Sequence, residues 1–272
     1  MTPKLQRQDI HTKQLPQEMM EHTYPILYRV EQSHWWYQGR RRIIAGFVGD
    51  ICKQVTSRHP QILDVGCGTG ANLLLLSKYG DAEGVDVSED ALAFCRKRGL
   101  DKVKKGAGEA LPYETATFDL VTAFDVIEHM DDDLAGLKEI RRVLRPGGRV
   151  LLFVPTFMFL WGLQDEVSNH RRRYRLPEVR TLLETAGFEI ERLTYANITF
   201  FLPILLVRKF MRLTGLKAST ENSINLPALN GVFGSLFGFE STMLRYVNLP
   251  FGVSGLCVAR AIHSSESPSA PS

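Results

Sequence analysis

The stretch ILDVGCGTGANLL, residues 62–74, decides the fold. An apolar run ends in the carboxylate Asp64, three glycines follow at alternate positions, and a run of leucines comes next. This order is typical of a buried strand, a tight turn and a helix. Glycines let the backbone turn sharply and approach a ligand without a Cβ clash. The stretch therefore predicts a strand, a ligand-facing loop and a helix.

Asp64 narrows the choice of ligand. The same letters, taken as G-x-G-x-x-A, fit a dinucleotide site with a pyrophosphate at the helix N-terminus. A carboxylate two residues before the first glycine would repel a pyrophosphate, which disfavours a dehydrogenase. It would attract the ammonium and sulfonium of S-adenosylmethionine (SAM), which has no phosphate. Asp86 ends the next predicted strand and would bind ribose hydroxyls with either ligand. Helix capping is the alternative role of both carboxylates.

Short apolar runs alternate with helical patterns along the chain. The predicted strands are 61–65, 82–87, 101–106, 118–125, 149–155, 189–195 and 254–261. Alternating strands and helices give a parallel sheet that is covered on both sides. We predict an α/β fold: a Rossmann-like seven-stranded mostly parallel sheet with helices on both faces, an N-terminal helical cap and a helical insertion before the last strand.

Five segments are expected along the chain. About fifty residues separate the last two predicted strands, far more than a hairpin loop needs, so they form an insertion. The segments are an N-terminal tail with cap helices (1–58), a SAM-binding core (59–195), an apolar helical insertion (196–250), the last strand (251–263) and a polar, disordered tail (264–272).

Five motifs, in order, resemble those of the class I SAM-dependent methyltransferases, a broad group that includes the quinone-biosynthesis methyltransferases. They are LDVGCGTG, GVDVS, EALPYETATFDLV, DVIEHM and RVLRPGGRVLLFVP. The resemblance covers about residues 60–155 and continues more weakly to 195 and at 254–261. It implies SAM as cofactor and S-adenosylhomocysteine as product, and no metal is expected.

The resemblance also implies residue roles. The glycine loop would line the methionine part of SAM, with Asp64 beside its ammonium, and the residues after the fourth strand would face the sulfonium and the acceptor. Members of the family usually have an Asp that binds the adenine amino group where this chain has Ala107, so Glu109, a backbone group or water would replace it, or the bond would be absent. The expected cofactor-binding residues of the core are Asp64, Gly66, Cys67, Gly68, Gly70, Asp86, Val87, Ala107, Gly108, Glu109, Phe124, Asp125 and Ile127.

The stretch HWWYQGRRR, residues 34–42, adds two cofactor candidates. It also resembles the N-terminal element of related bacterial methyltransferases. An aromatic ring here, with Trp36 as the candidate, would cover the sulfonium by a cation–π contact. An arginine, with Arg41 as the candidate, would pair with the SAM carboxylate. The alternative is a simple hydrophobic flap with exposed arginines.

The segment after the fifth strand supplies the catalytic candidates. A general base is needed only when the acceptor is a hydroxyl, an ammonium or an acidic C–H group. His170 is the first candidate, because a reference pKa of about 6.5 suits proton removal at neutral pH. Tyr174 and Asp165 are the reserves, and a hydrogen-bonding role of His170 in a lid loop is the alternative. The run 171–173 is Arg-Arg-Arg, which would clamp an anionic group or form a solvated basic face.

The insertion favours an apolar acceptor. The run ITFFLPILLV is followed at once by RKFMR, a pattern that suits a helix lying in a membrane interface. Residues 198–212 are therefore a candidate for peripheral membrane contact, and a helix packed over the domain is the alternative. We expect methyl transfer to oxygen or carbon of a small-molecule or lipid-linked acceptor.

Charge and composition bear on partners and location. Among 272 residues, 33 Lys and Arg stand against 30 Asp and Glu, so the net charge is +3, and nucleic acid is not an expected partner. A nucleic-acid methyltransferase also needs an Asp/Asn-Pro-Pro-aromatic turn where this chain has DVIEHM. A SAM-binding pseudoenzyme or partner-binding module stays open as an alternative. Four unpaired-looking cysteines, no signal-peptide pattern and no long apolar run predict a cytoplasmic chain, peripheral to the inner face of a membrane through 198–212.

Overall fold

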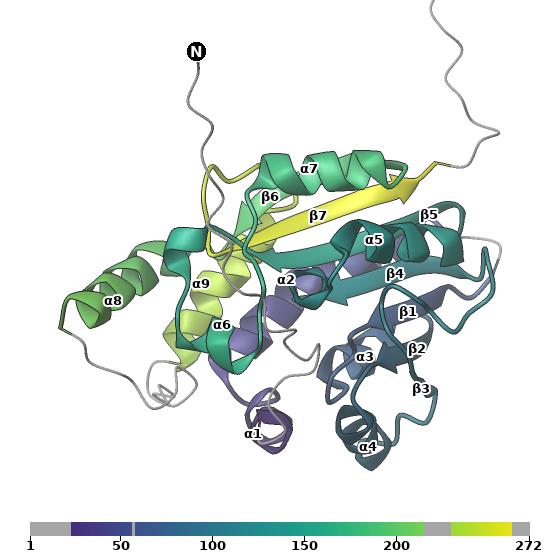
Figure 1. The fold of residues 1–272 in the computed structure, drawn as a ribbon, viewed down its shortest axis with the longest axis horizontal. Helices are drawn as coiled ribbons and strands as arrows, with labels where there is room; N and C mark the ends of the chain where they lie inside the picture. The colour runs from purple at the N-terminus through teal and green to yellow at the C-terminus, as the bar shows by residue number, and fades with distance from the viewer. Residues whose placement is uncertain (1–22, 56–57, 215–229, 263–272) are drawn as a thin grey trace, which may run out of the picture.

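A seven-stranded sheet runs through the centre of the molecule (Figure 1). The computed structural model describes residues 23–55, 58–214 and 230–262, so the predicted disordered tail at 264–272 lies outside the described residues. The strands are β1 (Gln61–Val65), β2 (Asp81–Asp86), β3 (Val103–Lys105), β4 (Phe118–Phe124), β5 (Leu144–Pro155), β6 (Phe188–Ala196) and β7 (Ser254–Ala261).

The strand order confirms the predicted Rossmann-like fold. It is β3-β2-β1-β4-β5-β7-β6, with β1 to β5 parallel and β7 antiparallel to both of its neighbours. The chain reverses its direction of sheet growth between β1 and β4. Ligands of open α/β sheets bind at such a switch point, outside the carboxyl ends of the strands.

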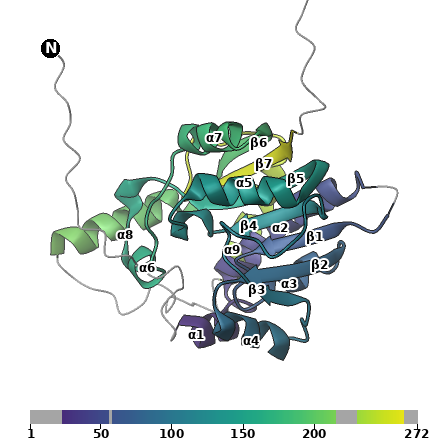
Figure 2. The same cartoon turned by 45° about the vertical axis from the view of Figure 1, so that its right-hand side comes forward.

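Helices cover both faces of the sheet (Figure 2). Ile62 of β1 packs into the core on the side of α2, α3, α4 and α9, and its neighbour Leu63 packs against α5 and α7 on the other side. Burial on both faces explains why the strands are continuous apolar runs. The helices are α1 (Thr23–Val30), α2 (Trp35–Cys52), α3 (Ala71–Leu76), α4 (Glu89–Lys97), α5 (Asp133–Val143), α6 (Leu163–Val167), α7 (Leu176–Thr185), α8 (Phe201–Thr214) and α9 (Asn230–Met243).

The N-terminal cap docks on the insertion through aromatic rings. Helix α2 begins at Trp35 because the Nδ1 atom of His34 accepts a hydrogen bond from the Trp36 N–H at 3.2 Å. The ring of Trp35 lies 4.7 Å from the ring of Phe233 on α9. Gly39 faces the ring of Phe237, where no larger side chain would fit. This close approach joins two segments that are nearly two hundred residues apart in the chain.

Helix α8 reverses the expected burial pattern. It extends away from one end of the sheet (Figure 1), and within the described helix Arg208 is the buried side chain. Ile204 packs against the core, whereas Leu206 is 62% and Leu213 is 77% exposed. One side of α8 therefore packs over the domain, and the other side leaves apolar residues exposed. Among the described residues, no helix combines the length and the apolar character needed to cross a bilayer.

Candidate functional site

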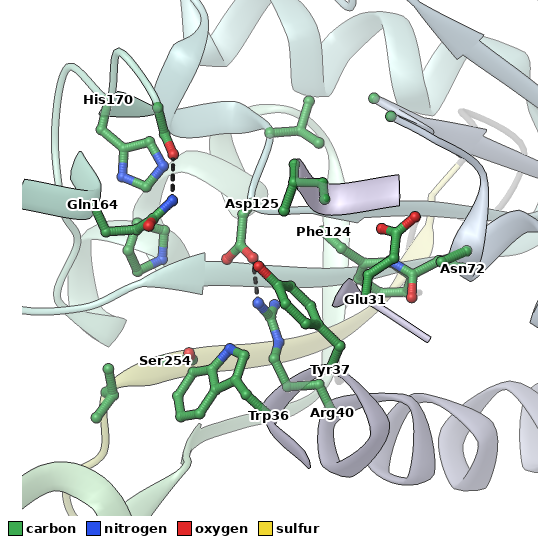
Figure 3. A pocket seen from close by; sticks show the side chains of 18 of the residues that line it. Glu31, Trp36, Tyr37, Arg40, Asn72, Phe124, Asp125, Gln164, His170 and Ser254 are labelled. Carbon is green, nitrogen blue, oxygen red and sulfur yellow. Dashed lines mark hydrogen bonds and ion pairs between the residues drawn. The ribbon is translucent and has the colours of Figure 1, made fainter. Parts of the chain in front are cut away.

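A cavity of about 840 Å³ opens at the switch point (Figure 3). One side, which we call the cofactor wall, consists of loop residues after β1, β2, β3 and β4. The other side, the acceptor wall, consists of side chains from the cap, from the short turn before α8 (Ile198–Phe200), and from α8 and α9. The cofactor wall includes Gly66, Gly68, Asp86, Val87, Gly108 and Phe124. The acceptor wall includes Trp35, Trp36, Phe200, Ile204, Met211 and Phe233.

The glycine loop holds Asp86 in place. Gly66 has φ +66°, and a Cβ atom there would lie 2.5 Å from Cγ2 of Val126. The Gly68 N–H donates to Oδ2 of Asp86 at 2.9 Å, and the Ser88 N–H donates to Oδ1 at 2.9 Å. The carboxylate is thus oriented by two backbone donors at the cavity edge, where its remaining lone pairs fit two ribose hydroxyls.

Asp64 lies behind the loop and does not line the cavity. Its side chain is 2% exposed and accepts a hydrogen bond from the Thr122 hydroxyl at 2.7 Å. Burial raises the pKa of Asp64 to about 7, the bond from Thr122 lowers it and the charge of Asp86 raises it further. The carboxyl group therefore lies beneath the glycine loop and does not face the cavity.

Most of the predicted cofactor residues line the cavity. They are Gly66, Gly68, Asp86, Val87, Gly108, Glu109, Phe124, Asp125, Trp36 and Arg41. The other predicted residues are not among those that line the cavity: Asp64, Cys67, Gly70, Ala107 and Ile127. A Cβ at Gly70, for example, would lie 2.8 Å from Leu100. Gly70 thus serves close packing rather than ligand contact.

The three consecutive arginines of the cap point in different directions. Arg40 forms an ion pair with Asp125 after β4 (Figure 3). Its guanidinium lies 4.8 Å from the centre of the Phe153 ring. Arg41 lines the cavity and donates to the Glu31 carbonyl at 2.6 Å. Arg42 donates to the carbonyl of Gly234. The pair between Arg40 and Asp125 therefore ties the cap to the end of β4.

His170 lines the cavity, and Asp165 orients its ring. Nδ1 of His170 and Oδ1 of Asp165 are 2.9 Å apart, and Arg173 donates to both oxygens of Asp165 at 2.7 and 3.0 Å. Burial alone would raise the pKa of Asp165, but the bonds from His170 and Arg173 outweigh it and bring the pKa to about 2. Asp165 is therefore a buried anion that positions His170, and the prediction of Asp165 as a reserve base is wrong.

Tyr174 does not fit the predicted reserve-base role either. Its side chain is 3% exposed, and its hydroxyl donates to Asp133 at 2.9 Å. Burial, together with the charge of Asp133, raises the pKa of Tyr174 far above its usual range. The hydroxyl holds α5 to the segment after α6, away from the cavity lining.

The predicted arginine clamp is also corrected. Each arginine has its own carboxylate partner: Arg171 pairs with Asp131, Arg172 with Asp133 and Arg173 with Asp165. Of these three, Arg173 lines the cavity. The triplet thus joins this loop to the segment around the start of α5 and does not converge on one anion.

Two polar side chains of the motif DVIEHM, Glu128 and His129, lie near the cavity. Glu128 is 0% exposed and neither carboxylate oxygen has a hydrogen-bond partner among the described residues. Burial raises the pKa of Glu128, and the charge of Asp125 raises it further. Burial also lowers the pKa of His129 to about 3, with the nearby His170 as the next cause. The motif DVIEHM contained these side chains, but nothing in it indicated that His170 lies beside them.

Comparison with known proteins agrees with this geometry. Residues 63–152 match the family described as methyltransferase domain. A probable S-adenosylmethionine-dependent methyltransferase of Mycolicibacterium smegmatis is 36% identical over 176 residues, which are 63% of this chain and 65% of the relative. A demethylmenaquinone methyltransferase of Staphylococcus aureus is 40% identical over 115 residues, 37% of this chain and 48% of the relative. The chain thus spans less than two thirds of either relative's length.

The solved structures agree on the fold. A SAM-dependent methyltransferase from Thermotoga maritima superposes with a TM-score of 0.54 at 19% identity, over 89% of this chain and 99% of that one. The match to the methyltransferase domain family covers residues 63–152, about a third of the chain. Fold and sequence together make the chain similar to the class I SAM-dependent methyltransferases, whose cofactor is SAM.

Proposed function

We propose that the chain transfers the methyl group of SAM to an oxygen or carbon atom of an apolar small-molecule or lipid-linked acceptor. One observation carries the proposal: the cofactor wall and the acceptor wall enclose the same cavity. Methyl transfer is an in-line displacement at a sulfonium carbon, so a protein contributes mainly alignment and a dry pocket. A cavity with a polar loop wall and an aromatic wall supplies both.

The cavity and its surroundings have a group suited to each part of SAM. Asp86 would hold the ribose, and the carboxyl group of Asp64 would attract the ammonium through the loop. Trp36 would lie over the sulfonium by a cation–π contact, and Arg41 would pair with the SAM carboxylate. S-adenosylhomocysteine would leave the same wall as product.

The acceptor wall suits an apolar molecule with one polar end. Its aromatic and aliphatic side chains come from the cap, α8 and α9, and His170 lies among the polar groups of the cavity. Because Asp165 holds Nδ1 of His170, the Nε2 lone pair is the one left for the acceptor's reacting group. The relative named as a demethylmenaquinone methyltransferase supports an acceptor of the lipid-linked kind.

The exposed apolar face of α8 supports peripheral membrane contact through residues 198–212. Leu206, Phe210 and Leu213 are each more than half exposed, and α8 also lines the cavity through Ile204 and Met211. A lipid-linked acceptor would then reach the cavity along this helix. Four free, buried cysteines support a location in the cytoplasm, at the inner face of that membrane.

The test uses SAM with a labelled methyl group, the purified full chain and an extract of the source cells, followed by partition between organic solvent and water. Label in the organic phase is the expected result. Label in water-soluble products would overturn the lipid-linked acceptor but keep the transferase. SAM binding with no transfer to any component would instead support a pseudoenzyme. Gly66→Ala, which distorts the glycine loop, is the matched control: any label that this variant transfers does not depend on SAM binding at the loop.

A further inference from the structure

We propose that Glu128, His129 and His170 bind one divalent cation of the Zn²⁺ or Mn²⁺ kind at the floor of the cavity. Each offers one ligand atom, and these atoms all lie within 4.8 Å of one another. Nε2 of His170 is 3.8 Å from Oε1 of Glu128, and the rings of His129 and His170 have centroids 4.7 Å apart. A small contraction would bring three donors to one ion.

Glu128 and His129 contribute donor atoms that have no hydrogen-bond partner in the part of the chain that the structure describes. Both carboxylate oxygens of Glu128 and Nδ1 of His129 are buried without a hydrogen-bond partner among the described residues. Glu128 is itself fully buried, and burying an unsatisfied carboxyl group is costly. One cation would satisfy these atoms together with Nε2 of His170. A bound cation would therefore give the Glu128 oxygens the partner that no described side chain provides.

The surroundings hold the donors as a metal site requires. Metal-binding imidazoles usually donate their other ring N–H to a carboxylate, which fixes the ring. Asp165 does this for His170, at 2.9 Å from Nδ1. The Arg171 N–H donates to the carbonyl of Glu128 at 3.0 Å, which locks the two segments that carry the donors side by side.

Nearby positive charges are compensated. The charges of Arg40 and Arg173 lower the pKa of Glu128. Arg40 pairs with Asp125, however, and Arg173 pairs with Asp165. Arg208 of α8 also faces Asp165, at 3.7 Å. Each of these guanidinium groups therefore has a carboxylate near it, and a divalent cation would meet two imidazoles and the carboxyl group of Glu128, which loses its proton on binding the ion.

This donor set determines the chemistry, given the proposed function on which the inference rests. Two imidazoles and one carboxylate leave open positions on the ion, and both imidazoles line the cavity. A bound divalent cation lowers the pKa of a hydroxyl group that reaches it. The structure therefore assigns the acceptor as a molecule with a hydroxyl group, a phenol or an enol, and the methylated atom as oxygen.

Methyl transfer to the acceptor oxygen breaks one bond to sulfur and forms one bond to oxygen. The acceptor hydroxyl gives its proton to water. Its oxygen lone pair forms the new C–O bond to the methyl carbon of SAM, and the C–S bond breaks with its electron pair on sulfur. The products are the methyl ether, S-adenosylhomocysteine and a hydrated proton.

The experiment titrates Zn²⁺ and Mn²⁺ separately into the full chain, untagged and freed of metal, by calorimetry. One ion per chain is expected, with affinity at least tenfold weaker in Glu128→Gln and in His170→Ala. His59→Ala removes an exposed histidine outside the cavity and is the matched control, with unchanged affinity expected. Folding of each variant is checked by its melting curve. Absence of stoichiometric binding, or equal affinity in all variants, would overturn the site.

SAM is titrated into the same samples, so that the two proposals fail separately. SAM binding without cation binding overturns the cation site and leaves the proposed function standing. Cation binding without SAM binding overturns the proposed function. Where both bind, transfer of label should stop with a chelator and return with the ion; transfer that persists in metal-free protein would overturn the catalytic role of the cation.

Discussion

The cofactor wall and the acceptor wall enclose one cavity but are built in opposite ways. The cofactor wall consists of short loops that directly follow parallel strands, so each contact is set within a few residues of a strand end. The acceptor wall joins helix α2 near the start of the chain to α8 and α9 near its end. The first wall is specified by local sequence, whereas the second depends on long-range packing.

The largest expected effect comes from a substitution in the glycine loop of the cofactor wall. Gly66→Ala places a Cβ 2.5 Å from Val126 at φ +66°, so the loop must move and SAM affinity should fall more than 100-fold in a calorimetric titration. Gly147→Ala is the control, because Gly147 also has a positive φ, +74°, but has open space around it. Both variants should lose about 1 kcal/mol of stability from backbone strain. Equal loss of SAM binding in both would contradict a special role of the loop.

A second variant breaks the link between the walls. Arg40→Ala leaves Asp125 without its ion-pair partner, so the free energy of unfolding should fall by about 1–3 kcal/mol and labelled methyl transfer should fall with it. Arg42→Ala removes a neighbouring, exposed arginine that bonds to Gly234 on α9, and it should cost less than about 1 kcal/mol. Thermal unfolding and transfer rates measure both. If the two variants behaved alike, the cap would not be fixed through Asp125.

A third prediction concerns pH and Asp64. The pKa of Asp64 in the folded chain is about 7, above the ordinary 3.8, so folding favours the protonated carboxyl group. The contribution of Asp64 to the free energy of unfolding is therefore complete below about pH 4 and is lost as the pH rises to about 7. A bound ammonium would favour the ionised form. SAM affinity should therefore rise about tenfold between pH 5.5 and 8 if SAM lowers that pKa by one unit. Asp64→Asn should flatten both profiles, and a titration series in pH would show whether it does.

The smallest effect belongs to the acceptor wall. Leu213→Asp, on the exposed face of α8, should weaken binding to vesicles of anionic lipid about fivefold and leave SAM affinity unchanged. Leu74→Asp makes the same change at an exposed leucine of α3 and serves as control in the vesicle assay. Co-sedimentation measures both, and equal vesicle binding in the two variants would remove the membrane role of α8.

The sequence predicted the fold and the cofactor wall because both depend on local patterns. Continuous apolar runs and the glycine loop identified β1, and the acidic end of β2 identified Asp86. The same patterns did not show that Asp64 turns toward Thr122 and away from the cavity. Strand periodicity gives the face on which a side chain lies, but the neighbouring strand decides its partner.

The acceptor wall was less predictable because its contacts are long-range. Consecutive arginines at 171–173 suggested one anionic ligand, but each found a carboxylate on another segment. The amphipathic pattern of α8 did not tell which side faces the cavity, and the structure turns Arg208 inward. His129 and His170 are brought together by the loop after α6, which no motif spacing records.

The most direct test of the central claim titrates the full chain with SAM and, separately, with NAD⁺ by calorimetry. A buried carboxyl group beneath the glycine loop should attract the ammonium of SAM and repel a pyrophosphate. We expect one SAM bound per chain and no measurable heat with NAD⁺. Binding of NAD⁺, or binding of neither ligand by the folded chain, would contradict it.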